Sequence, residues 1–363
     1  MKKIVFVLAV VFLAGSVLSA VDFFGNARIG YWYDMQDKDY NSGIAERTVL
    51  HYDLFSTSRF GVNFAGEDYT GKIEVSMCRT GVNLRQVWGE YDFGMLNVLV
   101  GQYYTGFFDL PNQATSIVSA SENLMIGYGL TYDSRNPMIK LSMDNGAYLI
   151  LMQPKLVDPI GAASLMGLDR EDIIDALLPK VNLGMRFNFD NLMLHPTFGV
   201  NMCKYNEDLP GLDESVLAYV AALTAKYCMG DLTILAQGSL GQNVSDYGIL
   251  SGATGGYAAW DPVEEEILNA TTTAGFLEFM YKLNDKTAFM AGGGFSGTDR
   301  DDYDDPNTAM TAYLNAKINL HPKMFIMPEI GMIDEQDNEN GVAEGSRMYF
   351  GLNLQADFDL NIK

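Results

Sequence analysis

The clearest pattern in the chain is a strict alternation of apolar and polar side chains near its C-terminal end. Between Met348 and Phe358 the even positions carry Met, Phe, Leu, Leu, Ala and Phe, while the odd positions include Asn353, Gln355 and Asp357. A period of two predicts a β-strand with one apolar and one polar face. The run is longer than most strands of soluble proteins. We therefore expect a strand that crosses a membrane, with its apolar face toward lipid and its polar face toward a wet interior.

The same alternation recurs along most of the chain, for example over 180–189, 217–227 and 310–320. A soluble β-sandwich also has amphipathic strands, but apolar faces that return on nearly every segment favour a membrane barrel. Sixteen strands are predicted, at 23–33, 50–64, 69–77, 82–93, 95–104, 124–133, 137–153, 179–189, 192–205, 215–228, 231–243, 271–283, 286–297, 308–320, 323–333 and 346–358.

The connections between these strands alternate between short turns and mostly longer loops, which is typical of transmembrane barrels. The segment 137–153 contains Asp144-Asn145-Gly146 and fits either one bulged strand or a hairpin of two. We favour one strand, because a hairpin would place the loop 154–178 on the rim that carries the short turns, including 134–136. The predicted fold is all-β, one closed antiparallel barrel that leaves no backbone group unpaired in lipid.

The first twenty residues have the layout of a secretory signal peptide. Met1-Lys2-Lys3 precede an apolar run over 4–18 and the small pair Ser19-Ala20. We expect cleavage after Ala20, and residues 21–363 as one barrel domain. An N-terminal membrane anchor is the alternative, but the run is short for a spanning helix, which needs about 20 residues.

Charge restricts the partners. The chain has a net charge of −22, which argues against binding to nucleic-acid phosphates. The densest acidic run is expected at the mouth of the barrel, in a long loop with Asp299, Asp301, Asp302, Asp304 and Asp305. A solvated loop that attracts cations is favoured over a calcium site, because the twelve-residue EF-hand spacing is missing. No motif of a metal site, a cofactor site or an enzyme is found, so none of these is predicted.

Two stretches resemble a known family. The first runs from Ser58-Arg59-Phe60-Gly61 through Gly66-Glu67-Asp68 to Gly71, and the second comprises 85–89, Phe93-Gly94 and 98–102. In order and spacing they are similar to the early hairpins of Gram-negative outer-membrane porins, and the close match covers about 58–105. The resemblance implies a sixteen-stranded barrel in outer-membrane lipid, a homotrimer, and a third long loop, here 105–123, folded into the pore.

The resemblance also implies site residues. In the family, arginines of the early strands face carboxylates of the third loop, and the matching pore-constriction residues here are Arg59, Arg85, Asp109 and Glu122. Arg85 stands one residue closer to Gly89 than in the family pattern, and the usual Pro-Glu-Phe-Gly-Gly run of the loop is absent. Phe358 corresponds to the terminal Phe that the barrel-insertion machinery recognises, with 359–363 as a small tail.

The alternation places further charges on the lumen wall. These are Arg28, Lys72, Glu74, Arg186, Lys317 and Arg347. Their functional interpretation is a transverse field that orients polar solutes, and the alternative is wall charge screened by water and salt.

Three functions remain open. The leading hypothesis is passive diffusion of small hydrophilic solutes and ions, with a preference for cations. The second is a surface-structural or adhesive barrel with a plugged lumen. The third is an outer-membrane hydrolase, but His51 lies on the lumen side by strand parity and is a poor candidate. Whether loop 105–123 leaves a passage separates the first two hypotheses.

Overall fold

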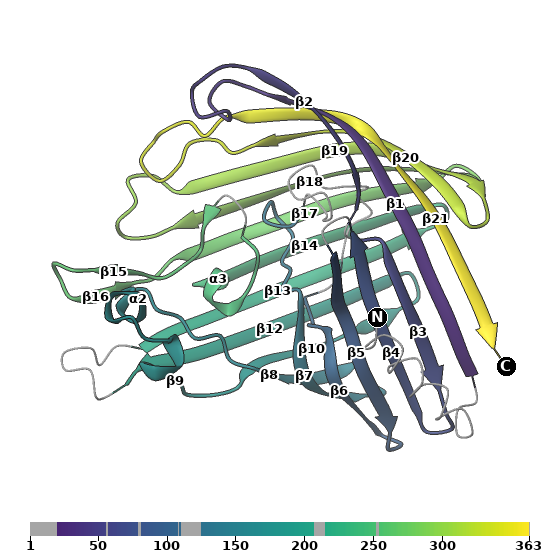
Figure 1. The fold of residues 1–363 in the computed structure, drawn as a ribbon, viewed down its shortest axis with the longest axis horizontal. Helices are drawn as coiled ribbons and strands as arrows, with labels where there is room; N and C mark the ends of the chain where they lie inside the picture. The colour runs from purple at the N-terminus through teal and green to yellow at the C-terminus, as the bar shows by residue number, and fades with distance from the viewer. Residues whose placement is uncertain are drawn as a thin grey trace.

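A single curved sheet closes on itself and forms the body of the molecule (Figure 1). The structure is a computed structural model that describes residues 20–55, 57–78, 81–107, 109, 125–206, 215–251 and 254–362. The predicted signal peptide therefore lies outside the described residues except for Ala20, which begins the first strand.

The described residues form strands of 3 to 17 residues and short helices. The strands are β1 (Ala20–Gln36), β2 (Arg47–Leu54), β3 (Arg59–Ala65), β4 (Tyr69–Cys78), β5 (Gly81–Asp92), β6 (Leu96–Tyr104), β7 (Arg135–Met143), β8 (Ala147–Met152), β9 (Ile174–Ala176), β10 (Lys180–Met185), β11 (Phe187–Phe189), β12 (Leu192–Tyr205), β13 (Ser215–Met229), β14 (Leu232–Gln242), β15 (Ala259–Asp261), β16 (Glu266–Leu268), β17 (Thr271–Lys282), β18 (Thr287–Asp299), β19 (Asn307–His321), β20 (Met324–Asp334) and β21 (Ser346–Ile362). The helices are α2 (Ala162–Met166), α3 (Val244–Tyr247) and the 3-10 helix η1 (Arg170–Asp172).

The barrel has sixteen strands once interrupted strands are joined, as the sequence predicts. β2 and β3 are two parts of one strand, since both pair with β1, and β9, β10 and β11 succeed one another against β12. β15 and β16 form a separate hairpin. Closure comes from β1 and β21, which pair antiparallel from Val21–Ile362 to Gln36–Arg347. β21 therefore runs past Phe358, and the expected tail at 359–363 is wrong as far as Ile362, because this segment pairs with β1.

Two strand predictions are wrong, and their errors cancel in the count. Residues 125–133 form turns with an isolated bridge between Ile126 and Leu130, rather than a barrel strand. The segment 137–153 is the hairpin β7–β8, because Gly146 takes a φ of +87° and the Asn145 side chain accepts the Ala147 N–H. The turn at 144–146 thus lies on the short-turn rim, where 134–136 was expected. Loop 153–173 stays on the long-loop rim.

The predicted two-faced strands are confirmed by side-chain exposure. In β21, Met348 is 52% exposed and Phe350 44%, while Tyr349 between them is fully buried. Exposed aromatic rings also gather beside the short turns, among them Tyr91, Phe93, Phe187, Phe189, Tyr227 and Tyr281. Such a girdle marks the interface of a bilayer with water, and the fold is that of a transmembrane β-barrel. None of the helices in the described ranges is long and apolar enough to cross a membrane.

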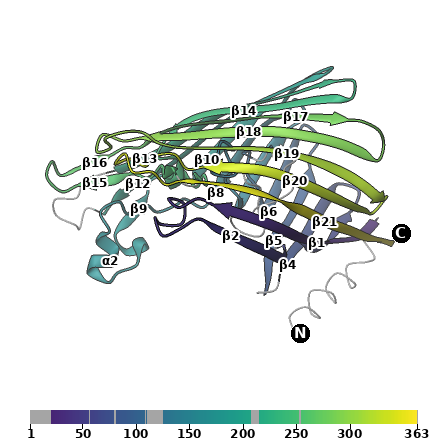
Figure 2. The same cartoon turned by 90° about the horizontal axis from the view of Figure 1, so that it is seen from above.

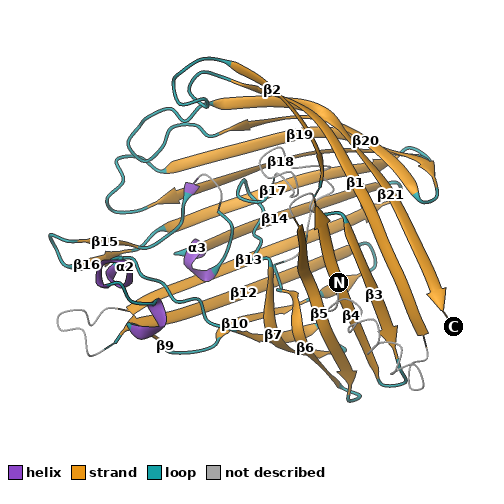
Figure 3. Ribbon diagram, in the orientation of Figure 1, coloured by secondary structure: helices purple, strands orange, loops and turns teal. Residues whose placement is uncertain are grey.

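Figure 2 shows β1, β2 and β4 on one side of the barrel and β14, β17 and β18 on the opposite side. The long loops, with α2 among them, gather at one end of it (Figure 3).

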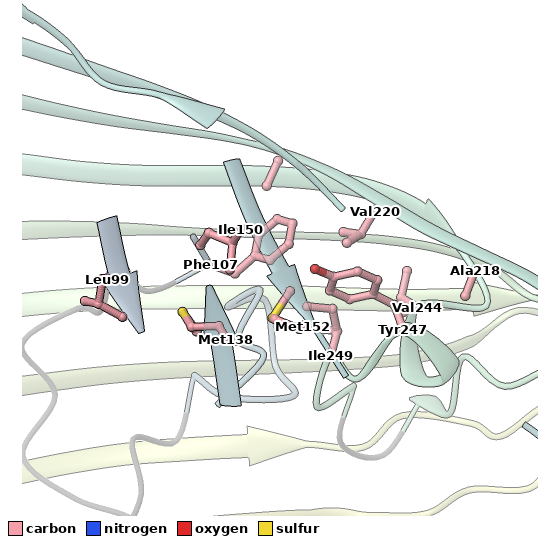
Figure 4. Packing of buried hydrophobic residues seen from close by; sticks show 11 residues of the cluster. Leu99, Phe107, Met138, Ile150, Met152, Ala218, Val220, Val244, Tyr247 and Ile249 are labelled. Carbon is pink, nitrogen blue, oxygen red and sulfur yellow. The ribbon is translucent and has the colours of Figure 1, made fainter. Parts of the chain in front are cut away.

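Two loop segments turn inward. The first segment, 244–249, is shown in Figure 4. Its Val244, Tyr247 and Ile249 pack, together with Phe107, against inward side chains of β6–β8 and β13. The second segment, 125–134, packs Met125, Leu130 and Tyr132 against Leu235, Phe276, Met290 and Tyr313.

Candidate pore constriction

Glu74 on β4 is the centre of a charged group in the lumen. Its side chain is fully buried, and its Oε1 lies 2.8 Å from Nε of Arg85 and 3.7 Å from Nη1 of Arg59. Its Oε2 lies 3.0 Å from Nζ of Lys72. β3, β4 and β5 are consecutive antiparallel strands, so alternation brings these side chains to one face. One carboxylate therefore holds three cations in place.

Arg85 reaches this group through a β-bulge. The β4–β5 register shifts between Glu74 and Val75, where Glu74 pairs with Gln86 but Val75 pairs with Leu84. The extra residue is Arg85, and a bulge can re-aim a side chain in this way. Its Nη2 donates to the Tyr104 hydroxyl at 3.1 Å. The shortened spacing to Gly89 seen in the sequence thus coincides with a local irregularity of the strand.

Two more arginines extend the positive charge. Arg28 on β1 lies within electrostatic range of Arg59 and Arg85, and Arg135 stacks over the Tyr104 ring at 5.4 Å. Nε of Arg28 and Nη1 of Arg135 are buried and make no hydrogen bond with any described residue. We call the five cations Arg28, Arg59, Lys72, Arg85 and Arg135, together with Glu74, the basic wall. Its surplus positive charge requires hydration, because an unpaired charge in a dry interior is very costly.

The opposite side of the lumen is covered by the described part of the third long loop. The Thr131 N–H donates to Oε1 of Gln237 at 2.8 Å, and the Tyr128 hydroxyl donates to Glu335 at 2.6 Å. The loop backbone at Tyr128 and Gly129 lies directly on β18, where a Cβ added to Gly294 would meet the Tyr128 carbonyl oxygen at 2.1 Å. Glycine at 294 therefore lets this loop segment lie flat against the wall.

Comparisons with known proteins agree with the barrel fold. No protein-family model and no curated protein matches the sequence. The fold is similar to the outer membrane channel DcaP of Acinetobacter baumannii, with a TM-score of 0.69, 17% identity, and 93% of this chain and 97% of that one covered. It is also similar to an anion-selective porin from Comamonas acidovorans (TM-score 0.63, 12% identity, 93% and 99% covered) and to Salmonella typhi OmpF in complex with daunomycin (0.60, 12%, 93% and 97%).

The chain has the outer-membrane porin fold. Within this porin barrel, the predicted constriction residues fall into two groups. Arg59 and Arg85 meet at Glu74, whereas Asp109 binds Nη2 of Arg186 at 2.7 Å and Nδ1 of His195 at 2.5 Å. No hydrogen bond or ion pair among the described residues joins Asp109 to either arginine. Glu122 lies outside the described residues.

The contacts of Asp109 with Arg186 and His195 fix the start of the third loop. Burial alone would raise the pKa of the Asp109 carboxyl, but the hydrogen bond with His195 and the charge of Arg186 hold this pKa below its usual value. Nε2 of His195 lies 2.8 Å from the Tyr148 hydroxyl, so the histidine links loop and wall. The carboxylate is therefore neutralised locally by the strands on which it rests.

The other predicted wall residues also face the lumen. Nη1 of Arg347 lies 3.2 Å from the fully buried Asp34 carboxylate. Lys317 on β19 stacks over the Phe325 ring at 4.4 Å. Phe358, the predicted insertion signal, lies on the outer face and covers Gly25 of the neighbouring strand.

The acidic run lies on the long-loop rim. Asp299, Asp301, Asp302, Asp304 and Asp305 are all exposed. Arg300 pairs with Asp302, and this hydrogen bond lowers the pKa of the Asp302 carboxyl. Within the described part of the chain, no group of three or more His, Cys, Asp or Glu residues is placed to hold a metal ion.

Sequence reasoning missed Arg135, Lys140, Lys180 and His195 as components of the lumen. Arg135 was assigned to a turn, and only the corrected β7 places it at the start of a strand. Lys180 and Arg186 already shared the polar face of the 180–189 alternation, which was a usable signal for Lys180. His195 alternates with Thr197, Gly199 and Asn201 in the same way.

Proposed function

We propose that this chain is an outer-membrane porin of a diderm bacterium, which forms a water-filled channel for passive diffusion of small hydrophilic solutes and ions. The observation that carries the proposal is the basic wall. Five cations gather on one side of the lumen, three of them around the buried Glu74 carboxylate, while the described loop segment 125–134 is held against the other side. A sixteen-stranded barrel is wide enough for an aqueous channel.

A preference for cations is the finer part of the proposal. It is supported by the 46 acidic against 24 basic residues of the chain and by the five exposed aspartates between Asp299 and Asp305. Such a field concentrates cations at the entrance. The basic wall opposes this preference at the narrower level of the pore, so the two groups make opposite contributions to selectivity.

Conductance in planar bilayers, with the reversal potential in a KCl gradient, tests the function. We expect open channels whose reversal potential indicates cation preference. Changing the five aspartates to Asn should reduce that preference, and Arg59→Gln should increase it, since each change removes one of the opposing fields. A folded barrel that never conducts would refute the channel, and a wild-type reversal potential of the opposite sign would refute the cation preference.

One observation favours the second candidate, a surface-structural barrel with a plugged lumen. Inward loop residues such as Phe107, Met125 and Tyr247 make apolar contacts deep in the barrel. A plug of this kind would exclude solutes while leaving the long loops free to bind a partner. The same bilayer experiment separates the candidates, because a plugged barrel gives no steady conductance.

We include two further assignments in the proposal. The chain forms a homotrimer, as supported by the similarity to a Vibrio cholerae outer membrane protein described in a trimer form (TM-score 0.58, 15% identity). Phe358 is recognised by the barrel-insertion machinery, as supported by its exposed position near the end of β21. Light scattering of the detergent-solubilised protein measures the first, and the amount of Phe358→Ala barrel in outer membranes measures the second.

A further inference from the structure

A cavity of about 420 Å³ lies in the lumen beside the basic wall, among β6, β7 and β8, with His195 of β12 also in its lining. Its lining includes Tyr103, Lys140, Tyr148, Ile150 and Arg186. This volume falls in the range of small-molecule sites, which are mostly apolar or aromatic with a few placed polar groups. The cavity therefore has both the size and the mixed lining of a ligand site.

Lys140 is the uncompensated charge of this cavity. Its ammonium lies 5.3 Å from the ring centroid of Tyr148 and 5.8 Å from that of Tyr103. It makes no hydrogen bond or ion pair with any described residue. Glu90 is within electrostatic range but forms no ion pair with it in the described part of the chain. A lysine held between two rings is thus left free to bind an anion.

Arg186 adds a second cationic group. Its Nη2 binds Asp109, while 46% of the side chain remains exposed. Asp109 also binds His195, so the carboxylate that pairs with Arg186 is already shared between two partners. The negative charge that would complete this site must then come from a ligand.

We propose that the cavity binds a small aromatic monocarboxylate. The carboxylate lies on Lys140 and the exposed edge of Arg186, and the flat apolar body lies against Tyr103, Tyr148 and Ile150. Charge-assisted hydrogen bonds hold the carboxylate, and ring contacts favour an aromatic body over a hydrated inorganic anion. This deepens the proposed function by naming a solute class, but binding itself does not require an open channel.

Isothermal titration of the full-length barrel in detergent tests the site, with benzoate as the probe. We expect benzoate to bind about tenfold more weakly to Lys140→Gln than to wild type, and Lys140→Arg to keep most of the affinity. Lys317→Gln is the matched control. It removes a lumen lysine that also stacks on a ring, but on β19, eight strands away around the sixteen-stranded barrel. Benzamide, which lacks the charge, and acetate, which lacks the ring, should each bind more weakly than benzoate.

Several results would overturn the site: no benzoate binding to wild type, equal weakening in Lys140→Gln and Lys317→Gln, or acetate binding as tightly as benzoate. If Lys140→Gln fails to fold, as judged by heat-modifiable mobility, Tyr103→Leu gives the same comparison through the ring. Bilayer recordings separate the two proposals. A barrel that binds benzoate through Lys140 without conducting keeps the site and refutes the channel, and one that conducts without selective binding does the reverse.

Discussion

On the side of the lumen formed by β3–β5, charged groups meet with few apolar contacts, and Glu74 is surrounded by Lys72, Arg59 and Arg85. On the side formed by β8, β10, β12–β14 and β17–β20, the loop segments 125–134 and 243–251 pack Met, Leu and Tyr side chains onto the strands. We call this second side the loop-covered wall. The first side needs water to be stable, whereas the second excludes it. This difference is why we propose that the passage runs beside the basic wall.

The difference between the basic wall and the loop-covered wall also predicts which substitutions should affect stability and which should affect permeation. The basic wall has more cations than its one carboxylate needs, so removing one of them leaves Glu74 paired and should mainly alter the field in the channel. Contacts of the loop-covered wall replace solvent, and their loss leaves cavities or unpaired groups. Substitutions there should mainly lower the free energy of unfolding.

The largest effect is expected at Lys180, whose Nζ lies 2.7 Å from Asp133 at the end of the loop segment 125–134. The two side chains are only 3% and 4% exposed. Lys180→Met leaves the Asp133 carboxylate buried without its cation, which costs about 3–5 kcal/mol. Urea unfolding of the barrel in detergent micelles should show a correspondingly lower midpoint.

The matched control is Lys282→Met, which breaks an exposed pair with Asp285 of similar length, 2.8 Å. It should leave the midpoint unchanged, because water replaces the lost partner. The double variant Lys180→Met/Asp133→Leu should recover much of the loss, since an apolar pair leaves no buried charge. Equal effects of Lys180→Met and Lys282→Met would show that the loop-covered wall is as hydrated as the basic wall.

This contrast explains how far the sequence predicts the fold. Period-two alternation identifies β21 correctly because lipid outside and water inside impose opposite polarity on neighbouring residues such as Met348 and Tyr349. The same alternation misassigns 124–133 as a strand. Leu130 and Tyr132 are apolar because they dock on the inner wall, and a sequence pattern does not distinguish that surface from lipid.

The candidate site shows the same limit. Strand parity and family resemblance together place Arg59 in the lumen, and parity places Glu74 there as well. The bulge that turns Arg85 inward depends on the pairing with β4, and the partners of Asp109 come from strands more than 75 residues away along the chain. Such contacts arise from tertiary packing and leave no local pattern.

The second prediction concerns Asp246 in the other inward loop. Burial raises the pKa of its carboxyl to about 6, and the Ala258 N–H and the charge of Lys155 oppose this only in part. The folded protein thus holds this proton more tightly than the unfolded chain, so stability falls as the pH rises from about 4 to about 6 and changes little above. A shift of about two pH units corresponds to at most about 3 kcal/mol.

Urea midpoints of wild type and Asp246→Asn, measured from pH 4 to pH 8, test this assignment. The variant cannot ionise at this position, so it should lack this part of the decline and be the more stable of the two above pH 6. Parallel curves for the two proteins would show that the Asp246 carboxylate is hydrated. The loop around α3 would then resemble the basic wall instead of a dry contact.

The smallest effect is expected for Gly294→Ala, which tests how closely loop and strand approach. The added methyl would meet the Tyr128 carbonyl oxygen at 2.1 Å, so the loop must lift from β18, at a cost of about 1–3 kcal/mol. Gly238→Ala is the control, since its added methyl meets nothing within 4 Å.

Because the lifted loop moves toward the basic wall, single-channel conductance should also fall in Gly294→Ala but stay at the wild-type level in Gly238→Ala. A less stable Gly294→Ala barrel with unchanged conductance would mean that segment 125–134 does not border the passage, and the opposition of the two walls would then describe stability alone.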